Sequence, residues 1–281
     1  KNYADQWEWG GRGLSGNEAL PWTENLINRF AERWSWGALS ANKGLPWTQD
    51  IIDEYVDQWS WGGEKLSTNE SLPWTEKLIR RYAHRWKWGF WGLSENEALP
   101  WTVELIERYD SRWYWKNHGL SVNGGLPWTR TLIDRYADHW RWNDRDGLGS
   151  NEALPWSEEL IGSYATRWHW GAFGLSSNEA LPWSEELIDR YSDRWNWEVA
   201  GLSGNEALPW TEKLISRYDH RWSWGRQGLS GNEALPWTLS LINRYSNRWN
   251  WKWLSLNRSV YEKVFSDRVT PRVIHRVFDS S

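Results

Sequence analysis

The residues best suited to chemistry in this chain are large or charged side chains at positions that vary between otherwise similar segments. Some lie between the two tryptophans of a Trp-x-Trp pair, and others lie in the loop after the pair. Large aromatic rings are costly on a plain surface and carry much of the energy of protein interfaces. We therefore predict a site for a protein or peptide partner, with neutral variation of exposed loops as the alternative explanation. The candidate residues are Phe90, Trp91, Tyr114, Arg141, His169, Phe173 and Trp253.

Catalytic chemistry has little support in the sequence. The six histidines occupy different positions of the repeated segment and lack metal-ligand spacing, and the sequence shows no phosphate loop, dinucleotide fingerprint or nucleophile elbow. Adjacent glutamates such as Glu158–Glu159 and Glu185–Glu186 fall at expected helix starts, where the helix dipole explains them. The sequence therefore predicts no enzyme activity, no cofactor and no metal site.

A tandem repeat must position the candidate residues. The segment Leu-Pro-Trp-Thr, or a near variant, recurs nine times at steps of 25 to 28 residues. Repeats of this length bury their apolar faces against their neighbours, so the sequence predicts a stack with an extended surface. The tryptophans of this segment are Trp22, Trp47, Trp74, Trp101, Trp128, Trp156, Trp183, Trp210 and Trp237.

Residues 175–197 are a clean copy of the repeat and show a helical pattern. Their apolar side chains are spaced at i, i+4, i+5, i+8 and i+12, as on one face of an amphipathic α-helix. Ser184 is the expected N-cap, and Glu185 and Glu186 fill the first turn. The pattern predicts a helix over residues 184 to about 195. Its apolar residues are Trp183, Leu187, Ile188, Tyr191 and Trp195.

A second, shorter helix is predicted before the Pro-Trp corner. Residues 176–179 read Ser-Ser-Asn-Glu, the form of a capping box, and Pro182 must end the segment. Each repeat is therefore a short helix, a corner and a longer helix. The predicted fold class is all-α, an α-solenoid of about ten repeats of 25–28 residues. The rival fold, a β-propeller or β-solenoid, conflicts with the helical spacing after each Pro-Trp corner.

The domain organisation follows from the repeat. Residues 1–13 are predicted to be a partial repeat, the end of a long helix, as in a processed product or a fragment. Residues 14–254 hold nine tandem Trp-rich repeats. Residues 255–281 are predicted to be a divergent C-terminal capping repeat, because residues 270–277 match residues 238–245 while the preceding Leu-Pro-Trp has been replaced.

The packing of the 31 tryptophans is the main ambiguity of the sequence. Those of the Pro-Trp corners are predicted to lie in the core. In the ten Trp-x-Trp pairs, two helical residues would point about 200° apart, and one ring would then leave the core. If the helix ends between them, both rings can turn inward. An outward ring in each repeat would instead form an exposed ladder.

Polar positions recur as well. An Asn is present in every repeat, as at Asn96, and its amide is predicted to bond backbone groups of the turn or of the adjacent repeat. Glu and Arg recur eleven residues apart, as in Glu70 and Arg81, and one repeat inverts the signs with Lys43 and Glu54. Our hypothesis is that these side chains touch, within a repeat or across the stack. A second Arg, before the first tryptophan of the pair, either covers aromatic faces or is solvated.

Composition excludes several kinds of protein. The formal net charge is −4, with both signs interspersed, which disfavours nucleic acid as a partner. No apolar run approaches the roughly 20 residues that a membrane span needs. Zero cysteines exclude disulfides and thiolate metal sites, and the joint absence of Cys and Met favours an extracellular or cell-surface location.

The order Trp-x-Trp, then Leu-Ser-x-Asn-x-x-Leu-Pro-Trp-Ser/Thr-x-x-Leu-Ile-x-x-Tyr, resembles the tryptophan-rich tandem repeats of uncharacterised bacterial proteins. More distantly, it is similar to repeats with Trp-Asp-Trp and Leu-Ser-x-Asn in some giant-virus proteins. The resemblance covers residues 3 to about 257 and implies a repeat solenoid, without implying an activity. The middle residue of the Trp pair, often Asp in those proteins, is never Asp in this chain.

Together these observations predict a non-catalytic repeat scaffold that binds a protein or peptide through its variable loop edge. One alternative is a filament or surface-layer element that self-associates end to end through residues 1–9. The other is a glycan-binding protein that uses an exposed Trp ladder. The solvent exposure of the paired tryptophans separates the ladder from the other two possibilities.

Overall fold

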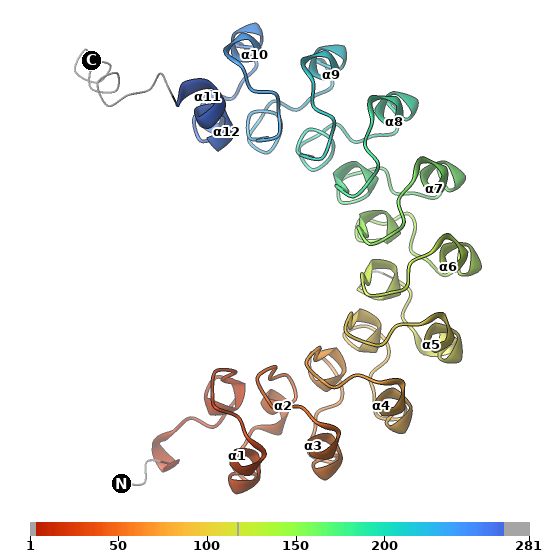
Figure 1. Ribbon diagram of the computed structural model, residues 1–281, viewed down its shortest axis with the longest axis vertical. Helices are drawn as coiled ribbons and strands as arrows, with labels where there is room; N and C mark the ends of the chain where they lie inside the picture. Colours follow the sequence, from red (N-terminus) through yellow and green to blue (C-terminus); the bar gives the residue numbers. More distant parts are fainter. Residues whose placement is uncertain (1–3, 117, 267–281) are drawn as a thin grey trace, which may run out of the picture. The chain divides into compact units, whose positions relative to one another are not determined.

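Most repeats consist of a tight 3₁₀ turn and a six-residue α-helix on either side of a Pro-Trp corner (Figure 1). The computed structural model describes residues 4–116 and 118–266, and none of these residues lies in a β-strand. The chain divides into two units, residues 1–141 and 142–281. Within each unit the six-residue α-helices form one layer and the 3₁₀ turns form the other (Figure 1).

The first unit contains six α-helices and six 3₁₀ segments among its described residues. Its α-helices are α1 (Glu24–Arg29), α2 (Trp36–Leu39), α3 (Gln49–Glu54), α4 (Glu76–Arg81), α5 (Val103–Arg108) and α6 (Arg130–Arg135). Its 3₁₀ segments are η1 (Ala4–Gln6), η2 (Leu14–Gly16), η3 (Leu66–Thr68), η4 (Leu93–Glu95), η5 (Asp110–Arg112) and η6 (Leu120–Val122).

The second unit repeats this order and then departs from it. Its regular elements are η7 (Leu148–Ser150), α7 (Glu158–Ser163), η8 (Leu175–Ser177), α8 (Glu185–Arg190), α9 (Glu212–Arg217) and α10 (Leu239–Arg244). They are followed by α11 (Trp251–Leu254), α12 (Arg258–Val260) and the π-helical segment η9 (Tyr261–Phe265). Residues 267–281 of the expected capping repeat, like residues 1–3 of the expected partial repeat, lie outside the described residues, so both boundaries stay predictions.

The longer helix begins where the sequence indicated but ends earlier. Ser184 is the N-cap of α8, and its Oγ accepts a hydrogen bond from the Leu187 amide at 3.0 Å. The prediction of a helix to about residue 195 was wrong, because α8 ends at Arg190. Tyr191 leaves the helical conformation (φ −118°, ψ 25°), and the Arg194 amide closes a turn onto its carbonyl at 2.8 Å.

The predicted capping box in the shorter element was also wrong. The 3₁₀ segment η8 ends at Ser177, and the side chain of Ser176 caps no helix. Its Oγ donates to the carbonyl of Trp170 in the preceding repeat at 2.5 Å and accepts from the amide of Asn196 in its own repeat at 2.8 Å. A serine at this position therefore connects neighbouring repeats, and this function fits its complete burial better than capping a helix at the surface.

In most Trp-x-Trp pairs both rings turn inward, because the helix ends before the pair; the exceptions, Trp7 and Trp251, belong to the first and the last pair and are 59% and 55% exposed. In the first unit, Trp88 lies 4.4 Å from Tyr109 and 4.9 Å from Trp113 of the next repeat, measured between ring centroids. In the second unit, Trp197 makes the same contacts with Tyr218 and Trp222 at 4.6 and 4.7 Å. The second ring of a pair thus packs into the following repeat, with the exception of Trp251, and the described repeats form no exposed ladder of paired rings.

The recurring asparagine joins adjacent repeats, as the sequence predicted. Asn96 is buried, its Nδ2 donates to the Ser67 carbonyl of the preceding repeat at 3.1 Å, and its Oδ1 accepts from the Ala98 amide at 3.0 Å. Its own carbonyl accepts from the indole Nε1 of Trp101 at 3.0 Å. The Asn96 side chain therefore satisfies backbone groups of two repeats, and its backbone carbonyl holds the tryptophan of the Pro-Trp corner.

The second recurring arginine covers an aromatic face, which confirms that alternative. The guanidinium carbon of Arg112 lies 5.3 Å from the ring centroid of Trp88, and its Nη1 donates to the Ala83 carbonyl at 2.7 Å. Arg221 repeats both contacts in the second unit, over Trp197 at 5.2 Å. Because ring and carbonyl belong to the preceding repeat, this arginine also binds neighbours together.

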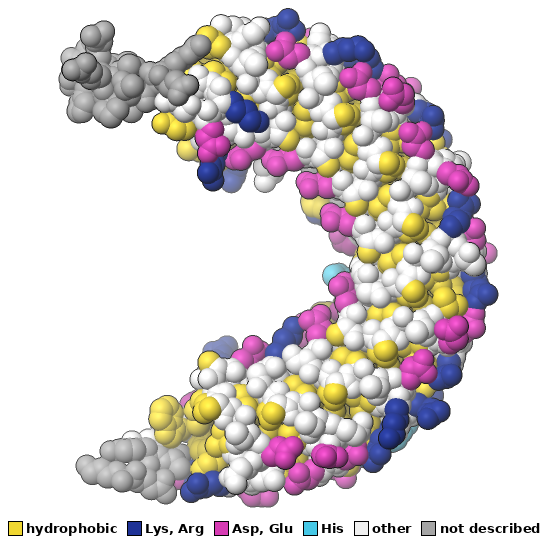
Figure 2. Space-filling model, viewed as in Figure 1, with side chains coloured by type: hydrophobic (Ala, Val, Ile, Leu, Met, Phe, Trp, Pro, Cys, Tyr) yellow, Lys and Arg dark blue, Asp and Glu magenta, His cyan; other side chains and the backbone are white. Residues whose placement is uncertain are grey.

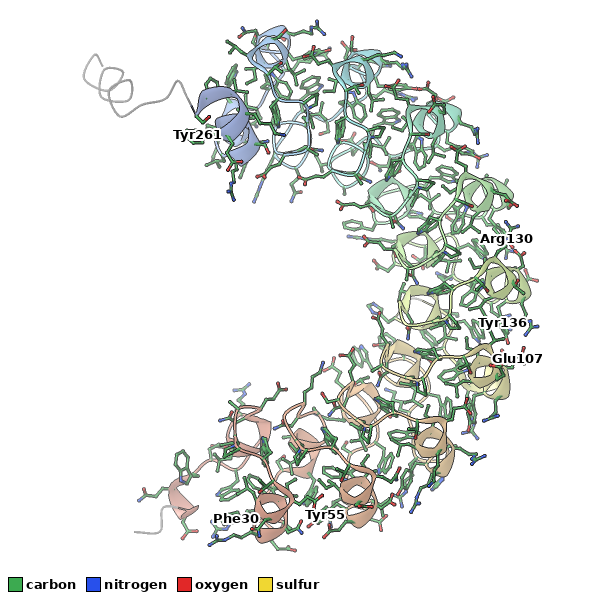
Figure 3. The ribbon with its side chains drawn as sticks, in the orientation of Figure 1. Phe30, Tyr55, Glu107, Arg130, Tyr136 and Tyr261 are labelled. Carbon is green, nitrogen blue, oxygen red and sulfur yellow. The ribbon has the colours of Figure 1, made fainter. Side chains whose placement is uncertain are left out.

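The recurring Glu and Arg do pair across repeats, but not with each other. Lys43 pairs with Glu70 at 2.9 Å, whereas Arg81 pairs with Asp53 at 2.8 Å, so the proposed Glu70–Arg81 contact was wrong. Arg135 of α6 likewise pairs with Glu107 of α5, which lies on the α-helical layer (Figure 3). Along this layer Lys and Arg side chains lie beside Asp and Glu (Figure 2), where exposed pairs contribute little stability each.

In the second unit, Tyr218 and Arg217 share hydrogen bonds with the carboxylate of Asp189. The Tyr218 hydroxyl donates to Asp189 Oδ1 at 2.6 Å, and Arg217 donates to the other oxygen of this carboxylate at 2.5 Å. Burial, followed by the hydrogen bond to Asp189 and its negative charge, raises the pKa of Tyr218 from 10.0 to about 12. Because the pKa is higher in the folded state, the stabilisation is complete below about pH 10 and is lost as the pH rises to about 12.

We expect the free energy of unfolding to decrease between pH 10 and pH 12 by more in the wild-type protein than in the Tyr218→Phe variant. The phenylalanine keeps the ring contact and removes the titrating hydroxyl. Urea unfolding at a series of pH values measures the difference between the two proteins. Parallel pH profiles for both would show that Tyr218 contributes nothing to this dependence.

Candidate functional site

The variable residues lie at the edge where the 3₁₀ turns of neighbouring repeats meet. The backbone amide of Tyr114 donates to Ser94 Oγ at 2.9 Å, and the amide of Arg141 donates to Ser121 Oγ at 2.9 Å. In the second unit Gly149 replaces this serine, so the His169 amide bonds the Trp142 carbonyl instead, at 3.1 Å. Because the contact is made by the backbone, the side chain is free to vary, which explains why many residue types occur at this position.

Two neighbouring loops of the first unit bring four aromatic side chains together. The rings of Phe90 and Trp91 are stacked, with centroids 4.5 Å apart and planes inclined by 28°. Tyr114 and His118 approach Phe90 edge to face, at 6.1 and 5.7 Å. We call Phe90, Trp91, Tyr114 and His118 the aromatic cluster. Phe90 is 39% exposed and Trp91 is 45% exposed, so the stacked pair presents ring surface to solvent.

The cluster depends on an unusual backbone. Trp91 has φ 52° and His118 has φ 55°, in the left-handed region that side chains other than glycine rarely adopt. Each is followed by a glycine that the turn requires: a Cβ on Gly92 would lie 2.1 Å from the Lys87 carbonyl oxygen. The Trp91 amide donates to Glu95 Oε1 at 2.6 Å, which holds the loop in place. Large rings at left-handed positions cost stability and often mark functional sites.

Because of this strain, we expect glycine to be tolerated better than alanine at position 91, the reverse of the usual order of stability. We expect Trp91→Gly to be more stable than Trp91→Ala by about 1 kcal/mol, because both lose the ring but only glycine adopts φ 52° freely. At an ordinary position the alanine would be the more stable of the two. Chemical denaturation of both variants measures the difference. An alanine variant as stable as the glycine variant would argue against strain at this loop.

The remaining candidate residues of the second unit form separate sites. Phe173, with φ 60° and 43% exposure, carries the guanidinium of Arg145 at 3.9 Å from its ring centroid. His169 begins the same loop, and its Nε2 lies 3.2 Å from the Ala172 carbonyl. Trp253 lies in the short helix α11 and not in a loop, with Arg226 at 4.4 Å from its ring. These sites offer cation–aromatic pairs and not an aromatic cluster.

The structure therefore unites only some of the residues that the sequence singled out. Phe90, Trp91 and Tyr114 meet in one cluster, whereas Arg141 is an exposed residue of a different loop in the same unit. His118 was missed, although its place before Gly119 matches the place of Trp91 before Gly92. A comparison of adjacent loops at the same repeat position would have found it.

The chemistry open to the aromatic cluster is binding. The rings offer apolar faces, and the Tyr114 hydroxyl and the His118 imidazole can form hydrogen bonds. Backbone hydrogen bonds close the two loops that carry these side chains. Within residues 4–116 and 118–266, no helix is long and apolar enough to cross a bilayer. Comparisons with known proteins found no significant match of this chain to a family model, to a curated protein or to a solved structure.

Proposed function

We propose that this protein is an α-solenoid scaffold that binds a protein or peptide partner through the aromatic cluster at its loop edge. The observation that carries the proposal is the exposed Phe90–Trp91 stack, which is maintained although Trp91 and His118 occupy left-handed backbone positions. Apolar rings that remain exposed at a cost in stability are typical of interaction surfaces.

The solenoid part of the proposal rests on contacts that recur from repeat to repeat. Packing of the second tryptophan of a pair against the following repeat, at every pair but the last, and the asparagine bond to the preceding repeat make neighbouring repeats depend on each other. The same pattern supports kinship with the tryptophan-rich tandem-repeat proteins that the sequence resembles. It also removes the main support for a glycan-binding ladder, which needs paired rings that face solvent.

A peptide selection tests the proposed function. Random peptides are selected against the wild-type protein, and the enriched peptides are measured against the Phe90→Ala variant. We expect these peptides to lose most of their affinity for that variant. The matched control is Phe173→Ala, which removes another exposed loop phenylalanine from the second unit and should leave binding unchanged.

Fluorinated phenylalanine provides a direct readout, because the chain has only five phenylalanines. Binding at the cluster should shift the ¹⁹F signal that the Phe90 substitution removes and leave the Phe173 signal in place. A selection that yields no peptide, or peptides that bind the Phe90→Ala variant as tightly as the wild type, would contradict the proposal.

A further inference from the structure

Building on the proposed function, we propose that the partner of the aromatic cluster is a protein segment that carries an arginine, whose guanidinium lies on the exposed ring of Trp91. Three features support this partner. A matching loop of the second unit already holds an arginine on its ring, the ring in the first unit has no cation of its own, and an unpaired carboxylate lies beside it.

Phe173 in the second unit occupies the same loop position as Trp91. Each is the third residue after a Trp-x-Trp pair and directly precedes a glycine. Both have left-handed φ values, 52° for Trp91 and 60° for Phe173, and both rings are exposed. Phe173 carries the guanidinium of Arg145, from the preceding loop, at 3.9 Å from its ring centroid. This loop position therefore presents a ring that a guanidinium can cover.

The equivalent ring of the first unit has no such cation. Phe90 stacks on Trp91, and within residues 4–116 and 118–266 no Lys or Arg side chain lies over either ring. The Lys87 side chain extends toward the preceding repeat, where its Cδ lies 4.0 Å from the place of a Cβ on Gly62. Lys116 forms no cation–aromatic pair with the described residues. A cation that covers Trp91 would therefore come from a partner.

A carboxylate lies beside this ring. Glu95 Oε1 accepts a hydrogen bond from the Trp91 amide at 2.6 Å, which fixes the negative charge at the backbone of the residue that carries the ring. Glu95 is half-buried, and in the described part of the chain it forms no ion pair and no second hydrogen bond. A guanidinium suits both groups, because it stacks on aromatic faces and donates hydrogen bonds to carboxylates.

Other partners fit this surface less well. The phosphates of a nucleic acid, or the carboxylates of an acidic peptide, would meet the charge of Glu95, and the formal net charge of −4 opposes both at longer range. The same charges favour a basic segment. Arginine is favoured over lysine, because an ammonium group lacks the planar face and the paired donors of a guanidinium.

Replacement of arginine by citrulline tests this partner, because citrulline keeps the size and planar shape of the side chain and removes its charge. We expect the peptides enriched by selection against the wild-type protein to share an arginine. Each peptide is synthesised with arginine or with citrulline at that position, and fluorescein is attached for anisotropy measurements. We expect citrulline to weaken binding about tenfold, through loss of the cation–aromatic contact and of the ion pair.

A charge-removing variant of the protein identifies the carboxylate. Glu95→Gln keeps an oxygen that can accept the Trp91 amide and removes the negative charge. We expect it to weaken the arginine peptides severalfold and to leave the citrulline peptides unchanged, while circular dichroism shows an unchanged fold. The matched control is Glu104→Gln, an exposed glutamate of α5 in the other layer, which should leave both kinds of peptide unchanged.

The outcomes separate this partner from the function beneath it. If the enriched peptides lose affinity for Phe90→Ala but share no arginine, or bind equally well with citrulline, the cluster binds peptides and the arginine is wrong. An equal effect of citrulline on the wild type and on Glu95→Gln would show that the carboxylate takes no part. If the selection yields no peptide, the proposed function is wrong as well.

Two further ligands test whether a protein segment is the source of the guanidinium. N-acetyl-arginine amide supplies the same group without a segment around it, and labelled oligothymidylate supplies bases that could stack on the rings. We expect both to bind more weakly than the arginine peptides. Equal or tighter binding of either ligand would overturn the assignment of a protein segment.

Discussion

Replacing Trp88 with alanine is expected to lower the free energy of unfolding by about 3–5 kcal/mol, the cost of removing a large buried aromatic side chain. Trp88 is 8% exposed and lies against Tyr109 and Trp113 of the following repeat, with Arg112 over its face. Its Nε1 also donates to the Ala83 carbonyl at 2.9 Å. The substitution therefore weakens the junction between two repeats and not merely the packing inside one.

Urea unfolding combined with amide hydrogen exchange measures this effect. In a stack that is held by nearest-neighbour contacts, a weak junction lets the repeats on its two sides open separately. We expect faster exchange in α4 and α5, on either side of the substitution, than in the remaining α-helices of the first unit.

Trp251→Ala is the matched control, because Trp251 occupies the same repeat position but is 55% exposed. Its Nε1 donates to the Ser246 carbonyl at 3.1 Å, as in the other repeats, so the local bond is the same. We expect its loss to cost less than about 1 kcal/mol. Similar costs for the two substitutions would show that the contacts between repeats do not carry the stability.

The second large effect is expected at the buried asparagine. Asn96→Leu keeps the branched outline of the side chain, although leucine is bulkier, and removes the donor to the Ser67 carbonyl and the acceptor for the Ala98 amide. Asn96 is 1% exposed, so water cannot replace these bonds in full. Stranded polar groups cost about 1–3 kcal/mol each, and we expect a total loss of about 2–4 kcal/mol.

Thermal and urea unfolding measure this loss, with Asn28→Leu as the control. Asn28 is an exposed helical residue that accepts a hydrogen bond from the Tyr55 hydroxyl at 2.6 Å. The same chemical change at this site should cost less than about 1 kcal/mol. An Asn96→Leu protein with wild-type stability would mean that the asparagine bonds between repeats are dispensable.

Stability and binding are thus expected to depend on different residues. The recurring serine, asparagine, arginine and tryptophan residues make the contacts between repeats, whereas the variable residues form the loop edge. Trp91→Gly is informative for this reason, because it should preserve the fold while it removes part of the aromatic cluster. Loss of peptide binding without loss of stability would separate the scaffold from its site.

The sequence alone predicted those features of the fold that depend on interactions between residues close together in the chain. The spacing of Leu187 and Ile188 predicted the helix. The N-cap at Ser184 was also predictable, because its hydroxyl bonds the amide of Leu187, only three residues along the chain. The tandem arrangement and the structural use of the asparagines also followed, because a buried amide needs partners at one fixed place per repeat. The candidate site was partly found, since Phe90, Trp91 and Tyr114 are unusual even as isolated residues.

Only the tertiary structure decided which side chains meet across repeats. Arg81 pairs with Asp53, 28 residues away, and not with Glu70. In a periodic sequence, a partner within the same repeat and a partner in a neighbouring repeat recur with the same period. The pattern alone cannot distinguish them. The end of the helix at Arg190 also depends on tertiary contacts. The apolar stripe runs on to Trp195, but the chain must leave the helix first if Trp195 is to pack in its own repeat and Trp197 in the following one. His118 joined Phe90 for this reason too, since neighbouring loops approach each other only once the repeats are packed together.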